Sequence, residues 1–207
     1  MTPQYPIRKQ RKAENRERLI LAAQELFQLN GYKATTMAGV AERAGLHNQT
    51  LYRHFKSKVE LAAAGGEAQL AHFQAGIEDD QRTDTTIQFW REYVARAVNL
   101  ATGEDQGRNY RELLHHFLES PSISSHIVQS GQQYQALLAA SLVRDVNVQD
   151  PEERLEIARL VAITLWGAHD DVQRRHEREE NYDLASETLA AIDRVEKLFA
   201  HVLVSSS

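Results

Sequence analysis

Three consecutive polar side chains, Asn48, Gln49 and Thr50, could hydrogen-bond to the edges of nucleic-acid bases. Asn and Gln can bond bidentately to adenine in the major groove of DNA, and Thr can contact a thymine methyl group. His47 precedes these residues and could join them. Side chains of this kind specify a sequence only when other contacts fix their register on the duplex, so the surrounding chain must supply a rigid support.

The stretch 36–58, TMAGVAERAGLHNQTLYRHFKSK, predicts that support as two short helices with Gly45 at their joint. A glycine tolerates positive φ, which lets one helix stop and the chain turn sharply into the next. The apolar positions that would pack the two helices are Val40, Ala41, Ala44, Leu46, Leu51 and Phe55. Two short helices joined in this way form a helix-turn-helix, whose second helix enters the major groove.

The sequence match extends on both sides of this joint. The residues that carry it are Gly31-Tyr32, Thr35-Thr36, Val40-Ala41, Ala44-Gly45-Leu46 and the run 50–58, TLYRHFKSK. Together with the amphipathic helix predicted before them, they resemble the DNA-binding domain of the TetR family of transcriptional repressors, over roughly residues 13–61. The resemblance implies an all-α fold of about nine helices: an N-terminal three-helix DNA-binding domain with the helix-turn-helix, then a larger helical domain for ligand binding and dimerisation.

The resemblance and the residue types together assign roles within this stretch. His47, Asn48, Gln49 and Thr50 are expected to contact bases, and Arg53 could contact either bases or phosphates. The residues expected to hold phosphates are Thr36, Tyr52, His54 and Lys58. Packing within the small domain is the alternative for Tyr52 and His54.

The charge of the chain is divided unevenly along its length. The 207 residues carry a net charge of −5. Residues 1–58 contain 11 Lys and Arg and 4 Asp and Glu, a net charge of +7, whereas residues 59–207 contain 13 and 25, a net charge of −12. A basic segment joined to an acidic remainder is typical of a DNA-binding domain attached to a part that does not bind DNA.

Several classes of protein are excluded or disfavoured by composition and motifs. The chain has no cysteine, which excludes disulfides, thiolate catalysis and cysteine zinc sites. It has no run of 18 apolar residues and no secretory signal, so we expect a cytoplasmic protein without a membrane span. No HExxH, GxSxG or phosphate-binding loop occurs, so we predict neither an enzyme nor a cofactor. His115 with Glu119, and His169 with His176, match no recognised zinc spacing, so no metal is predicted.

We expect three parts along the chain. Residues 1–12 hold two prolines and four basic residues, and predict a flexible arm that reaches phosphates or the minor groove, or is simply a solvated tail. Residues 13–56 are the expected DNA-binding domain, and residues 57–207 the expected effector-binding and dimerisation domain. Outside the helix-turn-helix, the predicted helices are 13–30, 57–78, 85–102, 108–119, 122–142, 151–178 and 183–204, with a loop at 102–107.

The larger domain offers candidates for ligand contact and for assembly. Polar or aromatic residues among apolar ones could line a pocket, although ordinary core packing is the alternative for each. They are Trp90, Tyr93, Tyr110, His116, Phe117, Tyr134, Trp166 and His169. The last two long helices have surplus apolar surface, which predicts a homodimer through a four-helix bundle, as in the family that the chain resembles.

These observations predict a DNA-binding transcriptional regulator. The resemblance implies a repressor that binds a near-palindromic operator as a homodimer and is released by a small-molecule effector. One alternative is a helical ligand-binding or scaffolding protein with a vestigial DNA-binding head, and another is an enzyme fused to such a head. Steep salt dependence of DNA binding separates the regulator from both alternatives.

Overall fold

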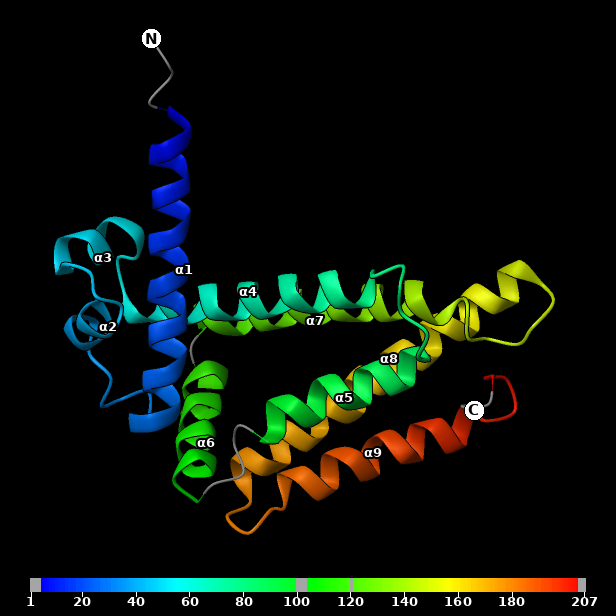
Figure 1. Ribbon diagram of the computed structural model, residues 1–207. Coiled ribbons are helices and arrows are strands. Elements are labelled where there is room, and N and C mark those ends of the chain that lie inside the picture. Colours follow the sequence, from blue (N-terminus) through cyan, green and yellow to red (C-terminus); the bar gives the residue numbers. More distant parts are fainter. Residues whose placement is uncertain (1–4, 100–103, 120, 205–207) are drawn as a thin grey trace.

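The computed structural model describes residues 5–99, 104–119 and 121–204, and these residues form nine α-helices and one isolated β-bridge (Figure 1). The helices are α1 (Tyr5–Asn30), α2 (Met37–Arg43), α3 (Asn48–His54), α4 (Lys58–Ile77), α5 (Thr86–Asn99), α6 (Glu104–Glu119), α7 (Pro121–Leu142), α8 (Pro151–Arg178) and α9 (Leu184–Phe199). The predicted all-α fold is confirmed for this part of the chain. None of these helices is both long and apolar enough to cross a membrane.

Residues 5–57, called the head here, consist of α1, α2 and α3. α2 and α3 lie on one side of α1, and Gly45 joins them with a φ of +63° (Figure 1). The head's core is formed by buried apolar side chains, including Leu19, Ile20, Ala23, Phe27, Tyr32, Val40, Leu51 and Phe55, with Leu61 from α4. α4 thus contributes to the head's core although it follows the predicted domain boundary after residue 56. That boundary stays a prediction.

The predicted N-terminal arm is wrong from residue 5 onward, because α1 begins at Tyr5. Residues 1–4 lie outside the described part of the chain. Pro6 falls in the first turn of α1, where a missing backbone N–H removes no helical hydrogen bond. The basic residues that follow Pro6 therefore lie on the part of α1 that projects beyond α2 and α3 (Figure 1).

The loop predicted at 102–107 is wrong for residues 104–107, which form the first turn of α6. Residues 102 and 103 lie outside the described residues. Asp105 lies in the first turn of this helix, and a carboxylate there interacts favourably with the helix dipole. The polar composition that suggested a loop therefore suits a helix N-terminus equally well.

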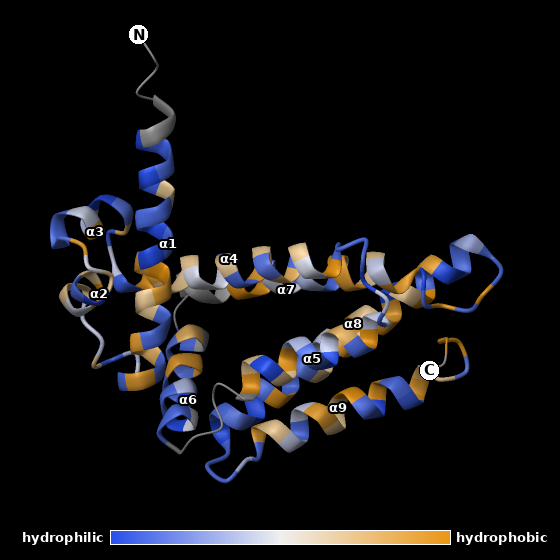
Figure 2. Cartoon of the chain, in the orientation of Figure 1, coloured by the Kyte–Doolittle hydropathy of each residue, from blue (hydrophilic) through white to orange (hydrophobic). Residues whose placement is uncertain are grey.

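Residues 58–204, called the body here, hold the remaining helices. α4 leaves the head and runs beside α7, while α5, α8 and α9 form a second group of packed helices (Figure 1). α6 lies beside the lower half of α1. Hydrophobic residues of the body lie mainly between these helices, with Phe73, Trp90, Leu138, Val161 and Leu165 among the most buried (Figure 2).

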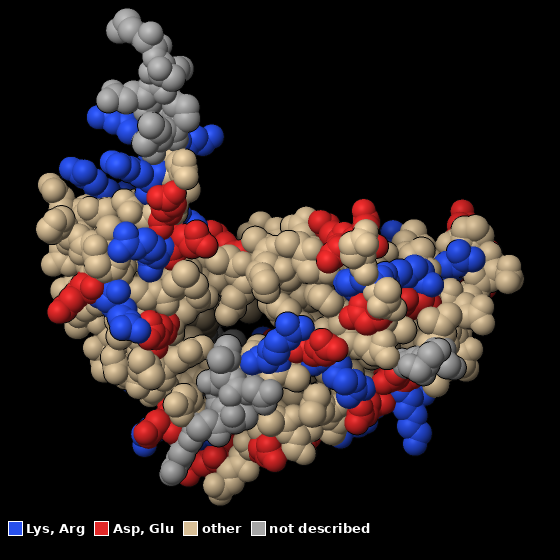
Figure 3. All heavy atoms as spheres, viewed as in Figure 1, with Lys and Arg blue, Asp and Glu red and all other residues tan. Residues whose placement is uncertain are grey.

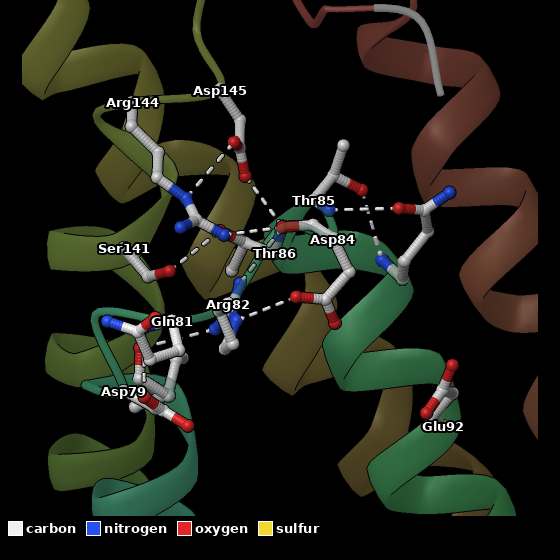
Figure 4. A network of polar contacts seen from close by, with 12 residues as sticks. Asp79, Gln81, Arg82, Asp84, Thr85, Thr86, Glu92, Ser141, Arg144 and Asp145 are labelled. Atoms are coloured by element: carbon white, nitrogen blue, oxygen red, sulfur yellow. Dashed lines mark hydrogen bonds and ion pairs between the residues drawn. The ribbon is translucent and has the colours of Figure 1, made fainter. Parts of the chain in front are cut away.

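A polar network fixes the end of the body that lies far from the head (Figure 4). The Asp145 Oδ2 atom accepts a hydrogen bond of 2.6 Å from the backbone N–H of Thr86, which caps the start of α5. The hydroxyls of Thr86 and Ser141 lie 2.8 Å apart, and Arg82 pairs with Asp84 at 2.8 Å. The loops before α5 and after α7 are thereby joined through buried, hydrogen-bonded groups.

Candidate DNA-binding interface and ligand site

α3 exposes its polar side and buries its apolar side. Leu51 and the following Phe55 are buried in the head's core. Asn48, Gln49, Tyr52 and Arg53 are exposed, as is His47 just before the helix, while Thr50 and His54 are partly exposed. Within the described residues, the side chains of the four exposed α3 residues make no hydrogen bond or ion pair with the rest of the protein. Their polar groups are therefore available to a ligand.

The joint between α2 and α3 is held from both sides. The Thr36 hydroxyl accepts a hydrogen bond of 3.0 Å from the Gly39 N–H and caps α2. Arg18 of α1 donates to the Ala44 carbonyl, and a Cβ at Gly45 would lie 3.0 Å from the Arg18 Nη2 atom. The Thr36 hydroxyl and the Arg18 side chain thus help to fix the angle between α2 and α3. The phosphate contact expected of Thr36 stays a prediction.

Positive charge extends from the head along the projecting part of α1. Lys and Arg residues gather there (Figure 3), and Arg8, Arg11 and Lys12 are exposed. Arg16 pairs with Glu67 at 3.3 Å and lies over the Phe55 ring at 5.4 Å. Burial, followed by the charges of Lys12 and Arg16, lowers the pKa of His54. His54 is therefore a neutral hydrogen-bonding group at neutral pH.

Lys58, the first residue of α4, is hydrogen-bonded to the head. Its Nζ atom donates to the carbonyls of Tyr32 at 2.6 Å, Thr35 at 3.0 Å and Lys33 at 3.3 Å. It also lies 4.3 Å from the centroid of the Tyr32 ring, and burial lowers its pKa. An ammonium group has three donors, and all three are directed at these carbonyls. The geometry favours a structural role for Lys58 over the phosphate contact expected from the sequence.

The body completes the C-terminal end of α1. Asn109 of α6 donates to the carbonyls of Gln28 at 2.8 Å and Leu29 at 3.0 Å, two groups that a helix end leaves unpaired. The Glu112 carboxylate accepts a hydrogen bond of 2.8 Å from the Lys33 N–H. We call Asn109 and Glu112 the α6 cap. No sequence pattern marked either residue, because their partners lie about 80 residues earlier in the chain.

Three of the expected ligand residues lie away from the others. His116 and Phe117 pack against Tyr32 of the head, with ring centroids 5.1 and 6.5 Å away. Tyr110 donates a hydrogen bond of 2.9 Å to Gln173 and stacks on His176. The structure thus places these side chains at the contacts of α6 with the head and with α8.

The other five expected ligand residues come together between α5, α7 and α8. With Phe73 of α4 they form what we call the aromatic cluster: Phe73, Trp90, Tyr93, Tyr134, Trp166 and His169. The rings of Tyr134 and Trp166 stack with centroids 4.9 Å apart, and those of Trp90 and His169 meet edge to face at 5.4 Å. The hydroxyls of Tyr93 and Tyr134 lie 3.3 Å apart. Sequence position alone did not indicate these pairings.

The aromatic cluster is uncharged at neutral pH. Burial raises the pKa of both Tyr93 and Tyr134, so their phenol groups stay protonated. Burial also lowers the pKa of His169 to about 4, so its imidazole is neutral. A surface of this kind favours an uncharged, flat ligand, because transferring a charge into it costs solvation free energy.

Comparison with known proteins identifies relatives of both parts of the chain. The family described as bacterial regulatory proteins, tetR family, matches residues 19–64. The transcriptional activator FasR of Mycolicibacterium smegmatis is 28% identical over 157 residues, 75% of this chain and 71% of FasR. The uncharacterized HTH-type transcriptional regulator TtgW of Pseudomonas putida is 31% identical over 123 residues, 58% of this chain and 89% of TtgW.

A solved structure with a similar fold is that of SmeT, the repressor of the Stenotrophomonas maltophilia multidrug efflux pump SmeDEF. Its complex with triclosan superposes with a TM-score of 0.62 and 21% identity, covering 92% of each chain. At this identity the likeness shows the fold alone. The family match spans α2, α3 and the parts of α1 and α4 that support them.

Proposed function

This chain belongs to the TetR family of bacterial regulatory proteins, and from that premise we propose a repressor that binds a near-palindromic operator as a homodimer and is released by a small-molecule effector. The observation that carries the proposal is the exposed polar side of α3, held on a buried apolar support. His47, Asn48, Gln49 and Thr50 contact bases in this proposal. The residues that contact phosphates are Thr36, Tyr52, Arg53, His54 and the exposed Lys56.

The outer faces of α8 and α9 supply the homodimer surface. Leu160, Ile163 and Leu198 are 55%, 53% and 66% exposed, and exposed apolar area of this kind is stabilised when a partner covers it. A groove of about 410 Å³ between the two helices is lined by Gly167, Asp171, Arg175, Arg194 and Leu198, among others. A twofold dimer through this face would place two copies of α3 in successive major grooves, about 34 Å apart.

The effector acts through the body. A small molecule that binds one conformation more tightly shifts the protein toward it, by no more than that difference in affinity. SmeT, solved with triclosan, supports a small-molecule role for this fold. The α6 cap links the body to α1. A displacement of α6 would therefore shift α1, on which α2 and α3 pack.

Selection of DNA fragments from the source genome, followed by footprinting, tests sequence reading. We expect a short near-palindrome to be enriched. Gln49→Ala should then weaken binding to it by about tenfold to a hundredfold, as expected from loss of a bidentate base contact. Gln81→Ala, the same change in an exposed turn of the body, is the matched control. No enrichment, or equal losses on operator and random DNA, would favour the ligand-binding protein with a vestigial head.

Light scattering of the purified protein tests the dimer. Ile163→Glu places a charge in the proposed interface and should convert the dimer to a monomer, with a loss of operator affinity. Val128→Glu is the control, because Val128 is 62% exposed and belongs to α7, outside the proposed interface. A dimer that survives Ile163→Glu but not Val128→Glu would move the interface elsewhere.

A further inference from the structure

Two buried polar atoms of the aromatic cluster have no hydrogen-bond partner among the residues that the structure describes. They are the Nε1 atom of Trp90 and the Nδ1 atom of His169. Trp90 is only 1% exposed, and its ring lies 5.4 Å from that of His169. A buried polar group without a partner costs roughly 1–3 kcal/mol, so such groups are rare in native proteins and need an explanation. A ligand that forms a hydrogen bond with each of these two atoms would explain why they have no partner in the protein.

The chemistry of the two atoms restricts what can complete them. An indole N–H can only donate, whereas a neutral imidazole has one nitrogen that accepts. Burial keeps His169 neutral, and in the tautomer protonated at Nε2 its unpartnered Nδ1 atom is an acceptor. With His169 in that tautomer, one ligand group that serves both rings must accept from Trp90 and donate to His169. A hydroxyl group does both with a single oxygen. A carboxylate only accepts and an ammonium group only donates, so each would leave one atom unsatisfied.

The surroundings of these atoms specify the rest of the ligand. Tyr134 and Trp166 stack with an angle of 14° between their planes, and Phe73 lies 4.8 Å from Tyr134. Flat aromatic rings pack against such faces in offset or edge-to-face arrangements. Tyr93, Trp166 and His169 are partly exposed, so the cluster reaches the molecular surface.

α7 is shaped to hold one of these rings close. A Cβ atom at Gly131 would lie 2.9 Å from the Trp166 Nε1 atom, closer than real Cβ contacts allow. Glycine at this position therefore lets the indole lie directly against α7. Four helices, α4, α5, α7 and α8, contribute to the cluster.

We propose that the aromatic cluster binds a phenol, whose hydroxyl accepts from Trp90 and donates to His169 while its ring packs against Tyr134 and Trp166. That this phenol is also the effector rests on the proposed function. The binding itself does not, because it follows from the two unpaired atoms and the rings around them.

Intrinsic fluorescence of the full-length protein can test the binding, because Trp90 and Trp166 are the only two tryptophans of the chain. Both lie in the aromatic cluster, so a change in emission reports on this site. We expect para-ethylphenol to bind about tenfold or more tightly than para-ethylanisole, since the methyl ether cannot donate to His169. Para-ethylcyclohexanol keeps the hydroxyl but lacks the flat ring, and should also bind more weakly. Equal affinity for the phenol and either analogue would overturn the proposal.

Two variants assign the preference to the proposed atoms. Trp90→Phe removes the N–H and keeps Trp166 as the reporter, and His169→Leu removes the ring nitrogens. Each should reduce the preference for the phenol over its methyl ether to about twofold or less. His72→Leu, a change at an exposed histidine of α4, is the control and should keep the preference. Circular dichroism checks that His169→Leu folds. If that variant has lost helix, the result for Trp90→Phe decides the test alone.

DNA binding by the same proteins separates this inference from the proposed function. Phenol preference without any enriched operator would overturn the proposed function and leave the phenol site supported. An enriched operator without phenol preference would do the reverse. If an operator is enriched and the phenol is preferred, adding para-ethylphenol should release the operator from the wild-type protein. It should release less of the operator from Trp90→Phe.

Discussion

The head and the body keep the polar groups that we propose to bind ligands in opposite states. In the head, Asn48 and Gln49 are exposed and solvated, and they rest on a core whose own polar groups are paired, as Lys58 and Arg18 illustrate. In the body, polar atoms of Trp90 and His169 are buried without partners among the described residues. DNA is a hydrated, charged ligand that binds to a preformed surface, whereas a small ligand is enclosed by the protein that recognises it. The second strategy reduces the stability of the unliganded protein.

The body also contains buried polar groups that are fully paired, at its far end (Figure 4). There the Asp145 carboxylate accepts from the Thr86 N–H, and the Thr86 hydroxyl pairs with the Ser141 hydroxyl. Burial alone therefore does not distinguish the aromatic cluster from the rest of the body. The lack of partners distinguishes the aromatic cluster from this far-end network, and the following predictions measure that difference.

The largest loss of stability should come from the paired network. Asp145→Ala leaves the buried N–H of Thr86 without its acceptor and should lower the free energy of unfolding by about 3 kcal/mol, or the Tm by about 6–12 °C. Asp79→Ala, which removes an exposed carboxylate that accepts from the Gln81 N–H, should cost about 0.5 kcal/mol or less. Thermal and urea unfolding compare the two, and similar losses would mean that the far-end network adds little.

The aromatic cluster should make the protein sensitive to acid. The folded pKa of His169 is about 4, below its ordinary value of 6.5, so the unfolded state binds more protons between these pH values. Stability should therefore fall as pH falls from 6.5 toward 4, by up to about 3 kcal/mol. His54 and His176, whose pKa values are also lowered, contribute with the same sign.

Urea unfolding at several pH values checks this expectation. His169→Gln should flatten the pH dependence, because its side chain does not titrate, whereas His72→Gln at an exposed site should leave it unchanged. An unchanged slope in His169→Gln would show that the cluster is more hydrated than its burial implies.

Lys58, at the start of α4, and Lys56, at the end of the head, provide a smaller contrast. Lys58→Met leaves three carbonyls without their donor and should lower stability by about 1–2 kcal/mol. Lys56→Met should leave stability nearly unchanged but weaken binding to all DNA sequences, and reduce the slope of log affinity against log salt by about 0.9. Measuring both quantities for both variants separates support from phosphate contact. A reduced salt slope in Lys58→Met alone would restore the role expected from the sequence.

The smallest effect on stability should come from substitutions on the exposed polar side of α3. Tyr52 is 56% exposed, so Tyr52→Ala should change the free energy of unfolding by about 0.5 kcal/mol or less while weakening DNA binding. Tyr32→Ala, at a buried ring of the same head, should cost several times more. If Tyr52→Ala destabilised the protein as much as Tyr32→Ala, the alternative of packing within the domain would apply to Tyr52.

The helix-turn-helix could be predicted because its determinants are local. Gly45, the apolar positions around it and the polar start of α3 lie within about twenty residues, so periodicity and one turn residue suffice. The role of Lys58 could not be predicted, because the carbonyls it binds lie 23 to 26 residues away and are brought near only by packing. A basic residue after α3 looks the same in sequence whether it faces a phosphate or a carbonyl.

The body was predictable as helices but only partly as a site. Trp90, Tyr134 and Trp166 could be chosen as aromatic residues among apolar ones, and packing brings them together. Phe117 has the same local pattern, yet it packs against the head. Which face of α6 meets which neighbour depends on contacts across the whole chain, and no local pattern encodes that choice.

The α6 cap has a consequence for modularity. The final turn of α1 is completed by Asn109 and Glu112, residues that a fragment ending after the reading helices would omit. Transplanting this head onto an unrelated body would leave those carbonyls and the Lys33 N–H to water. A working chimera would therefore need its crossover point placed after α6, so that the unit exchanged runs from α1 through α6 and includes the cap.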